Sequence, residues 1–426
     1  MGIPRLSNGR VLLLHPPGQG RARYQLDGYC SQPQKGPFRW HPLDFCAFAA
    51  RLATDGVEVD IVDLGFKGSA APANYQGYDA IIGLVGAWGW IDQRRFWREV
   101  IEGDNPPVFL SGDLARHEPA YVFDELPGLA GIIPELADPP TLHDLTGSSP
   151  RVWRNEQDQF HLPRPAKGFR LGVQPFQAWD LARYRLPFDT PEPFASVFTQ
   201  VGCPHHCDYC ILSTYDPAFR DIDEIFAEFE AAKRAGCRHV YVRDATFNSA
   251  PGHYLAVAEQ LGSLGLAWNA FARIDGIAEH AELLHANGCR VLQFGIDSPD
   301  PEVLADRRKD TRSTDVREAL KAVNQAGIRT VGHFVYGLEE PPLSPRAIAS
   351  YASRVGLDWL TISPLMVRPG TSLWSGTEPE RFDSLDARKV PTVLPALLQF
   401  YGHPGRIAST TLPTLAKYAA ASLNRF

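Results

Sequence analysis

The chain has 426 residues, 44% of them hydrophobic and 21% charged, and a formal net charge of −7. This length and apolar content fit two or three domains with ordinary cores and exclude a disordered segment or a small disulfide-bonded fold. The acidic balance argues against a protein that binds duplex nucleic acid through its phosphates. No apolar run is long enough for a membrane span, and residues 1–10 lack the core of a signal peptide, so we expect a cytoplasmic protein.

The first 140 residues alternate short apolar runs with helical segments. Segments about 41–55 and 93–101 have the character of helices. The predicted strands are 11–14, 57–62, 79–85, 108–112 and a shorter one at 131–133. Such alternation predicts a doubly wound, Rossmann-like α/β domain over residues 1–140, with a mostly parallel sheet. Ligands of such sheets bind beyond the carboxyl ends of the strands.

The next segment, residues 141–190, is rich in proline and has no long periodic pattern, which predicts a linker. From residue 191 onward, about six strands alternate with helices. One of these helices is predicted at 221–235, with Asp221 as its N-cap and Gly236 as its stop. Six strand–helix units predict a curved parallel sheet over 191–370, an open relative of the eight-stranded TIM barrel with its site at the strand C-termini. Residues 371–426 are predicted to form a helical C-terminal region.

Three of the seven cysteines lie on one loop. Cys203, Cys207 and Cys210 directly follow the first strand of the second domain, with the spacing CxxxCxxC. Three thiolates at this place can hold three irons of a cubane [4Fe–4S] cluster and leave the fourth iron open to a ligand. A four-coordinate zinc site that takes His205 or His206 as its fourth ligand is the alternative. The odd cysteine count does not suit a disulfide framework.

The other four cysteines are scattered along the sequence. Cys237 and Cys289 precede predicted strands and Cys46 lies in a predicted helix, so we expect small buried apolar residues there. Cys30 follows the first strand, where a role toward the substrate is the alternative to a structural one. An auxiliary iron–sulfur cluster would need thiols that lie closer together in the sequence.

The cysteine loop resembles that of the radical S-adenosylmethionine (radical SAM) superfamily. In that family the open iron chelates S-adenosylmethionine, and electron transfer cleaves a carbon–sulfur bond to give methionine and a 5′-deoxyadenosyl radical. The resemblance covers about 190–375. It continues through five segments in the family's order, namely 243–247 (RDATF), 271–275 (FARID), 294–298 (FGIDS), 335–340 (VYGLEE) and 368–371 (RPGT).

This resemblance implies roles for individual side chains. Tyr209 would pack near the adenine, and Arg273 would contact the carboxylate of the ligand. Asp297 and Ser298 would lie near the ribose, and Asp244 near the methionyl end. Each of these could instead be an ordinary polar residue at a strand end.

His333 stands where the family usually has glycine. It is interpreted either as a general acid or base that faces the substrate or as a hydrogen-bonded histidine inside the barrel.

The N-terminal domain resembles the cobalamin-binding subfamily in weakened form. Its segments 11–17, 79–84, 111–113 and 133–136 resemble the sequence motifs that are usual in that subfamily. Two adjacent glycines are usual at 111–112, and only one of them, Gly112, is present. The resemblance implies Ser111, Gly112 and Trp88 as contacts of the cofactor, because small residues admit its nucleotide tail close to the backbone. Trp88 either shields the lower face of the corrin or fills the space of an absent cofactor. No Asp-x-His-x-x-Gly motif is present, so a histidine ligand to cobalt is not expected.

Together these resemblances imply a cobalamin-dependent radical SAM methyltransferase of secondary metabolism that methylates an unactivated carbon. A small-molecule or peptide substrate and an external electron donor, such as flavodoxin or ferredoxin, would be its partners. One alternative is a radical SAM enzyme with a vestigial cobalamin fold that cyclises, rearranges or oxidises its substrate, or transfers an aminocarboxypropyl group. An alternative of another class is a non-catalytic metal-binding sensor. The sequence does not identify the substrate.

Overall fold

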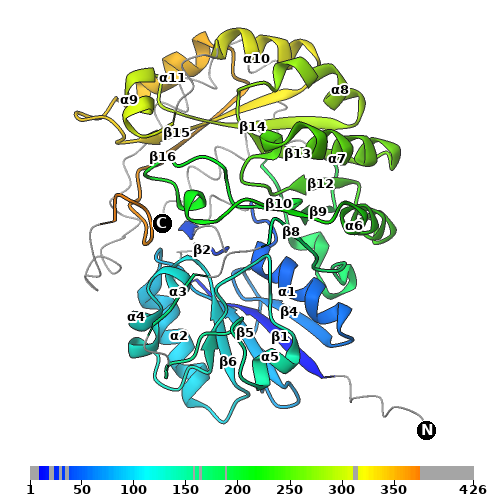
Figure 1. Cartoon of the computed structure of the whole chain (residues 1–426), viewed down its shortest axis with the longest axis vertical. Helices are drawn as coiled ribbons and strands as arrows, with labels where there is room; N and C mark the ends of the chain where they lie inside the picture. The colour runs from blue at the N-terminus through cyan, green and yellow to red at the C-terminus, as the bar shows by residue number, and fades with distance from the viewer. Residues whose placement is uncertain are drawn as a thin grey trace.

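The structure is a computed structural model that describes residues 9–18, 24–27, 31–33, 38–156, 159–162, 166–187, 190–309 and 315–374. Two parallel sheets form its two halves. The half built from the N-terminal part of the chain is coloured blue to cyan in Figure 1, and the half built from the later part is green to yellow. Cys30 and nearly all of the predicted C-terminal helical region, 375–426, lie outside the described residues.

The first sheet has five parallel strands in the order β4-β1-β5-β6-β7. The strands are β1 (Arg10–His15), β4 (Glu58–Asp63), β5 (Ala80–Leu84), β6 (Val108–Ser111) and β7 (Gly131–Ile132). The order of strands reverses at β1, and ligands of doubly wound sheets bind beyond the carboxyl ends of the strands at such a point.

Helices cover both faces of this sheet. They are α1 (Leu43–Thr54), α2 (Trp90–Glu102), α3 (Asp113–His117), α4 (Pro119–Glu125) and α5 (Leu142–Thr146). Side chains alternate between the two faces of a strand, so Val11 and Leu13 pack in the same core as α1. Leu12 and Leu14 pack in a second core, which contains residues of α2, α3 and α4. The α/β fold with a parallel sheet that the sequence predicts is confirmed for this half.

The second sheet has six parallel strands in the order β16-β15-β14-β13-β12-β9. The strands are β9 (Phe194–Val197), β12 (His239–Val242), β13 (Ala267–Ala272), β14 (Cys289–Asp297), β15 (Arg329–Tyr336) and β16 (Trp359–Pro364). The helices that connect them are α6 (Ile222–Arg234), α7 (Pro251–Ser263), α8 (Ala281–Ala286), α9 (Pro301–Asp306), α10 (Val316–Gln325) and α11 (Pro345–Arg354). Figure 1 shows α6, α7, α8 and α10 around the outside of this sheet.

Helix α6 begins and ends as its sequence predicts. The Asp221 carboxylate accepts hydrogen bonds from the backbone N–H groups of Asp223 and Glu224, which satisfies two donors that the first turn leaves open. The helix ends before Gly236, whose φ of +89° is a left-handed conformation that glycine adopts without strain. The helix is thereby fixed immediately before β12.

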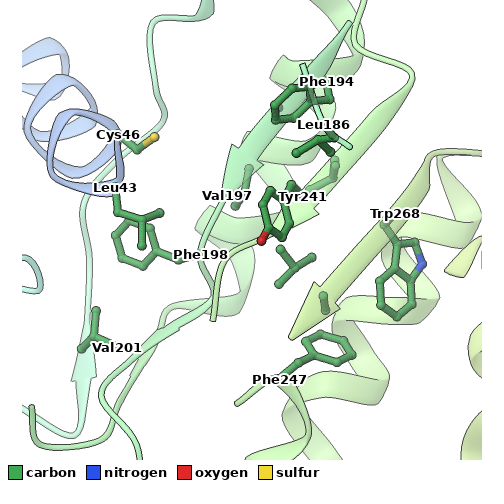
Figure 2. Close-up of a cluster of buried hydrophobic side chains, with 14 of the residues drawn as sticks. Leu43, Cys46, Leu186, Phe194, Val197, Phe198, Val201, Tyr241, Phe247 and Trp268 are labelled. Atoms are coloured by element: carbon green, nitrogen blue, oxygen red, sulfur yellow. The ribbon is translucent and has the colours of Figure 1, made fainter. Parts of the chain in front are cut away.

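One hydrophobic core joins the two halves. Figure 2 shows Leu43 and Cys46 of α1 facing Val197 and Phe198, at the end of β9. Cys46 is 1% exposed, and its thiol contacts the carbonyl oxygen of Ser196 at 3.8 Å. The halves therefore pack directly against one another, through α1.

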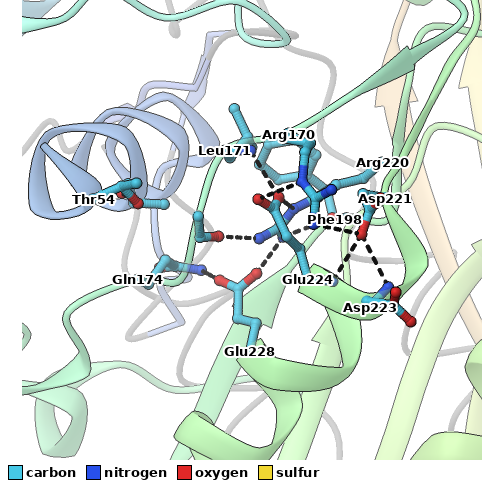
Figure 3. Close-up of polar contacts among 12 residues, drawn as sticks. Thr54, Arg170, Leu171, Gln174, Phe198, Arg220, Asp221, Asp223, Glu224 and Glu228 are labelled. Carbon is cyan, nitrogen blue, oxygen red and sulfur yellow. Dashed lines mark hydrogen bonds and ion pairs between the residues drawn. The ribbon is translucent and has the colours of Figure 1, made fainter.

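The linker contributes short elements that pack on both halves of the molecule. They are β8 (Gly168–Phe169), which pairs with β11 (Ala218–Arg220), the partner of β10 (Gln200–Val201), and two short 3-10 helices, η1 (Phe176–Ala178) and η2 (Leu181–Arg183). Figure 3 shows the buried polar groups that hold the linker against the second half. Gln174 donates to Glu228 at 2.5 Å, and Glu228 pairs with Arg220. Arg220 and Glu228 are 3% and 0% exposed.

The remaining short elements are β2 (Tyr24–Gln25) and β3 (Gln32–Pro33), which pair with each other, and the 3-10 helices η3 (Ile211–Thr214), η4 (Phe247–Ser249) and η5 (Ala278–His280). Within the described ranges, none of the helices has the length and apolar content needed to span a membrane.

Candidate functional site

The cysteine loop lies between β10 and η3, just beyond the carboxyl end of β9. Its path depends on Gly202, which has a φ of +70° and whose missing Cβ would overlap the backbone of Tyr215 and Asp216. Within the loop, the Cys210 N–H donates to the Cys207 carbonyl at 3.1 Å. The loop therefore turns back on itself and brings the three predicted cysteines to one edge of the second sheet.

Two thiols of this loop, those of Cys207 and Cys210, sit in an environment that favours their protonated form when no metal is bound. Burial raises the pKa of Cys207, and it raises the pKa of Cys210 to about 12. Iron binds the thiolate, so formation of a cluster here must release these protons. The Cys203 sulfur lies 3.5 Å from the Thr246 hydroxyl.

The arrangement of these side chains bears on the choice between zinc and a cluster. Among the residues that the structure describes, no three His, Cys, Asp or Glu side chains are placed to hold a single metal ion. The geometry thus gives no support to a tetrahedral zinc site with His205 or His206. A cubane fits better, because its three cysteines bind three different irons and need not converge on one point.

Asp244, predicted near the methionyl end of the ligand, lies just beyond β12 and binds the segment that leads into the cysteine loop. Its carboxylate accepts from the Thr199 N–H and the Thr199 hydroxyl, both at 2.6 Å, and from the Gln200 N–H at 3.1 Å. Burial raises the pKa of Asp244 to about 6. Its contacts in the structure are those of a residue that positions the cysteine loop.

Tyr209 and Asp297 contact one another beside the cysteine loop. The Tyr209 hydroxyl donates to Asp297 at 2.6 Å, and burial, together with the charge of Asp297, raises the pKa of this phenol. Asp297 has a φ of +62°, and the pairing of β14 with β15 is irregular between Gly295 and Asp297. This irregularity turns the carboxylate toward the cysteine loop.

Lys309 is a site residue that the sequence motifs did not indicate. Its ammonium pairs with Asp297 and donates to the Gly295 carbonyl at 2.6 Å, with the side chain 8% exposed. Lys309 lies three residues beyond α9, outside every strand-end motif. The basic run Arg307-Arg308-Lys309 was the one signal, and such runs are usually solvated.

Arg273 and Ser298 lie at the same edge. The Arg273 guanidinium pairs with Asp275 at 2.7 Å, and its backbone N–H donates to the Asn248 side chain at 2.8 Å. Ser298 donates to Glu339. Asn248, which also donates to the carbonyls of Arg273 and Asp275, is a second positioning residue that the motifs missed.

The charges of this edge reach the cysteine loop. Burial has the largest effect on the pKa of Cys207. The groups that act on this pKa next are Lys309, Asp297, Cys203 and Arg273. The predicted residues Tyr209, Arg273 and Asp297 thus gather around the loop. Fixed cations and carboxylates side by side suit a ligand that carries an ammonium, a carboxylate and a sulfonium.

The three residues predicted at the first sheet lie together at its carboxyl edge. Ser111 donates to Asp44 at 2.7 Å. Gly112 has a φ of +121°, and a Cβ there would overlap the Val85 carbonyl. Trp88 is 4% exposed, and its backbone N–H donates to the Ser31 hydroxyl.

Asp113, which the sequence did not single out as a site residue, ties this edge together. It is 0% exposed and accepts from the Ser31 N–H and hydroxyl and from the Ala87 and Leu114 N–H groups, at 2.9–3.1 Å. Arg368, just beyond β16 of the other sheet, donates to the same carboxylate at 3.0 Å. The Ser31 and Asp113 side chains also fill the space beside Gly86, the residue before Ala87, because a Cβ there would overlap both.

A corrinoid would fit one part of the carboxyl edge of the first sheet but not the part that Asp113 holds together. In the segment from the end of β1 to α1, four buried atoms have no hydrogen-bond partner within the described residues: His15 Nε2, Gln25 Oε1, Trp40 Nε1 and His41 Nε2. Buried polar atoms are rarely left unpaired, and the amide arms of a corrinoid could pair with such groups. This part fits the cofactor, whereas the part held by Asp113 would have to open for it.

The comparisons with known proteins agree with the site. Residues 197–350 match the family model of the Radical SAM superfamily. An uncharacterized methyltransferase, PH0819, of Pyrococcus horikoshii is 25% identical over 212 residues, which are 47% of this chain and 45% of that protein. Bacteriochlorophyllide d C-12(1)-methyltransferase of Chlorobaculum tepidum is 26% identical over 201 residues, 43% of this chain and 44% of that enzyme. The matches thus span less than half the length of these curated relatives.

Solved structures with this fold include two enzymes that contain both halves. The radical SAM methyltransferase TsrM of Kitasatospora setae, with cobalamin and a [4Fe–4S] cluster bound, aligns with a TM-score of 0.59 at 15% identity over 86% of this chain and 77% of that one. The cobalamin-dependent radical enzyme OxsB, with aqua-cobalamin and S-adenosylmethionine bound, aligns with a TM-score of 0.56 at 15% identity over 89% of this chain and 55% of that one. At this identity the likeness shows the fold alone. The family match at 197–350, together with the cysteine loop, identifies a radical SAM domain in this part of the chain, and the cofactors that such a domain implies are a [4Fe–4S] cluster and S-adenosylmethionine.

Proposed function

We propose that the chain is a cobalamin-dependent radical SAM methyltransferase that acts on an unactivated carbon. The observation that carries the proposal is that the carboxyl edges of the two sheets, where each binds its ligands, contact one another. Asp113 of the first half pairs with Arg368 of the second, and the Arg116 guanidinium lies 3.9 Å from the centre of the Tyr215 ring, just after the cysteine loop. Groups bound at the two edges would therefore be neighbours.

The domain boundaries enter as part of this proposal. Residues 1–140 would form the cobalamin-type domain, 141–190 the linker and 191–370 a partial (β/α)6 barrel. The observed sheets support this division, since β7 ends at Ile132 and β9 begins at Phe194. The names of the two curated relatives support methyl transfer as the reaction.

In the second half, the chain's own residues hold and orient the reactants. When bound, the [4Fe–4S] cluster supplies the electron that breaks a carbon–sulfur bond of S-adenosylmethionine. Cys203, Cys207 and Cys210 would hold the cluster, and Asp244 keeps their loop in place through Thr199 and Gln200.

Other side chains would orient S-adenosylmethionine. Arg273 and Lys309 offer cations to the carboxylate of the ligand, and Asp297 offers an acceptor for its hydroxyl or ammonium groups. Tyr209 holds the Asp297 carboxylate through the 2.6 Å hydrogen bond, which fixes its direction.

In the first half, the residues at the sheet edge would hold the corrinoid, which supplies the methyl group when bound. Gly112 allows the chain to turn against the Val85 backbone at this edge, and Trp88 offers an apolar surface. His15 and Gln25 present the unpaired polar atoms. A small-molecule or peptide substrate and an electron donor such as flavodoxin or ferredoxin complete the set of proposed partners.

The test is anaerobic reconstitution with iron and sulfide, then incubation with S-adenosylmethionine and dithionite, with 5′-deoxyadenosine measured by chromatography. Cys207→Ala should abolish the product and lower the bound iron. Cys237→Ala, which removes a buried thiol at the start of β12, serves as the matched control. A wild-type protein with a complete cluster that forms no 5′-deoxyadenosine would refute hydrogen abstraction.

A second candidate is favoured by the contacts of Asp113. A radical SAM enzyme that binds no corrinoid, and that cyclises, rearranges or oxidises its substrate, would keep this edge closed. Titration with hydroxocobalamin, followed by gel filtration and absorbance, separates the two. Retention of about one corrinoid per chain supports the methyltransferase, and its complete loss supports the second candidate.

A further inference from the structure

The inner face of the six-stranded sheet carries a row of aromatic and neutral polar side chains. Strand register places Tyr241 of β12, Phe271 of β13, Gln293 of β14, His333 of β15 and Thr361 of β16 on the same face. The opposite face carries apolar residues such as Leu292 and Phe294, both 0% exposed, and packs on the helices.

Rings continue along this face from strand to strand. The rings of Phe271 and His333 are 5.1 Å apart, and those of Tyr241 and Phe271 are 6.2 Å apart. Trp40, from the segment that precedes α1, extends the row, with its ring 6.4 Å from that of Tyr241. Trp40, Phe271 and His333 are each partly exposed, in contrast to the fully buried face behind them.

A chain of hydrogen bonds fixes the direction of the Gln293 amide. The Thr361 hydroxyl lies 2.7 Å from His333 Nδ1, and His333 Nε2 lies 3.3 Å from Gln293 Oε1. If the hydroxyl donates, the neutral imidazole carries its proton on Nε2 and donates to the amide oxygen. His333 is therefore a hydrogen-bonded histidine within this row, and the oxygen side of Gln293 is occupied.

The nitrogen side of Gln293 is left without a partner. Gln293 is 2% exposed, and its Nε2 has no hydrogen-bond partner in the described ranges of the chain. The same holds for Nε1 of Trp40, at the other end of the row. A buried N–H without an acceptor is costly, so two such donors beside one row of rings indicate a ligand that brings acceptor atoms.

The charges nearest this face are already compensated. Arg243, over the rings of Trp40 and Tyr241 at 5.5 and 5.0 Å, pairs with the buried Asp27 at 2.5 Å. Arg273 pairs with Asp275 and is already assigned to S-adenosylmethionine in the proposed function, so it is not available to a second ligand. A charged ligand would have to give up its hydration here without a free counter-charge in return, so a neutral one is favoured.

We propose that this inner face binds the substrate and that the substrate is a neutral, flat aromatic or conjugated molecule with a carbonyl or similar acceptor. The rings of Tyr241, Phe271 and His333 would stack against it or pack at its edge, and Gln293 and Trp40 would donate to its acceptors. This inference rests on the proposed function, because it assigns the substrate class of the same site.

The test uses two tricyclic probes of similar size. Acridone has a ring carbonyl, whereas carbazole is flat and has none. Equilibrium dialysis against the cluster-reconstituted full chain with S-adenosylmethionine gives both dissociation constants. We expect acridone to bind more tightly than carbazole. Gln293→Leu should weaken acridone roughly three- to tenfold, as expected for one hydrogen bond, and leave carbazole unchanged.

Two further variants complete the design. Trp40→Phe keeps a ring but removes the N–H, so it should weaken acridone alone and keeps the test informative if Gln293→Leu does not fold. Phe271→Ala should weaken both probes. Gln325→Leu makes the matched change on the exposed side of α10 and should alter neither constant.

The outcomes separate this inference from the proposed function. A chain that forms 5′-deoxyadenosine but binds neither probe, or binds acridone equally well in both donor variants, overturns the substrate class alone. A chain that binds acridone as expected but forms no 5′-deoxyadenosine supports the site and contradicts the proposed chemistry.

Discussion

The buried carboxylate of Asp244 gives the sharpest prediction about the cysteine loop. Burial raises its pKa from 3.8 to about 6, although it accepts three hydrogen bonds from Thr199 and Gln200. The folded state thus holds this proton more tightly than the unfolded state does. The resulting stability is present below pH 3.8 and is lost as the pH rises through about 6. A shift of about two units corresponds to about 3 kcal/mol.

Asp244→Asn removes this titration while it keeps the shape of the side chain. The stability of the variant relative to the wild type should therefore rise by up to about 3 kcal/mol between pH 4 and pH 8. At roughly 1 °C per kcal/mol for a chain of 426 residues, the difference in Tm should change by about 3 °C. Thermal unfolding of the cluster-free chain at five pH values measures it. Asp216→Asn, at an exposed carboxylate beyond the cysteines, controls for the loss of one charge. Parallel Tm curves, or a change of opposite sign, would refute the reasoning.

Two further predictions concern the packing that places the site. Glu228→Gln removes the nearer of the two counter-charges of the buried Arg220 guanidinium, the other being Glu224 at 3.9 Å, and should destabilise the chain by about 3 kcal/mol in urea unfolding. Glu230→Gln, exposed on the same helix, should change little, and equal effects would contradict a buried pair. Gly112→Ala should cost about 2 kcal/mol or more, because φ is +121° and a Cβ would overlap backbone. Gly68→Ala, with positive φ but open space, separates strain from overlap, and similar losses in both would show that overlap contributes little.

The elements that the sequence predicts best are those whose signal is local. The predicted helix at 41–55 is found at Leu43–Thr54, and the apolar run at 11–14 lies within β1, because buried strands of a parallel sheet need apolar side chains on both faces. The cysteine loop could be predicted because its ligand spacing lies within eight residues.

The residues that sequence reasoning missed act through distant contacts. Asp113 accepts from Arg368 across 255 positions of sequence, and Lys309 reaches Asp297 from a loop beyond α9. No periodicity or motif marks such a residue, because its partner is chosen by how two strand edges meet. Asp244 shows the related difficulty: its position was predicted, whereas its hydrogen bonds to Thr199 and Gln200 depend on the path of the neighbouring loop.

The contacts between the two halves explain why the first domain matters to the chemistry of the second. Asp27 and Arg243 are 4% and 9% exposed, so their 2.5 Å pair forms at a large cost of desolvation. Buried pairs of this kind contribute little net stability, but a displaced partner leaves a buried charge uncompensated. Any other relative placement of the two edges would separate Asp27 from Arg243 and leave a buried charge uncompensated. The pair therefore destabilises the other placements more than it stabilises this one. The first domain would thus fix the opening of the second sheet whether or not it holds a corrinoid, and a vestigial cofactor edge would still be retained for the position that it gives to Trp40 and to the cysteine loop.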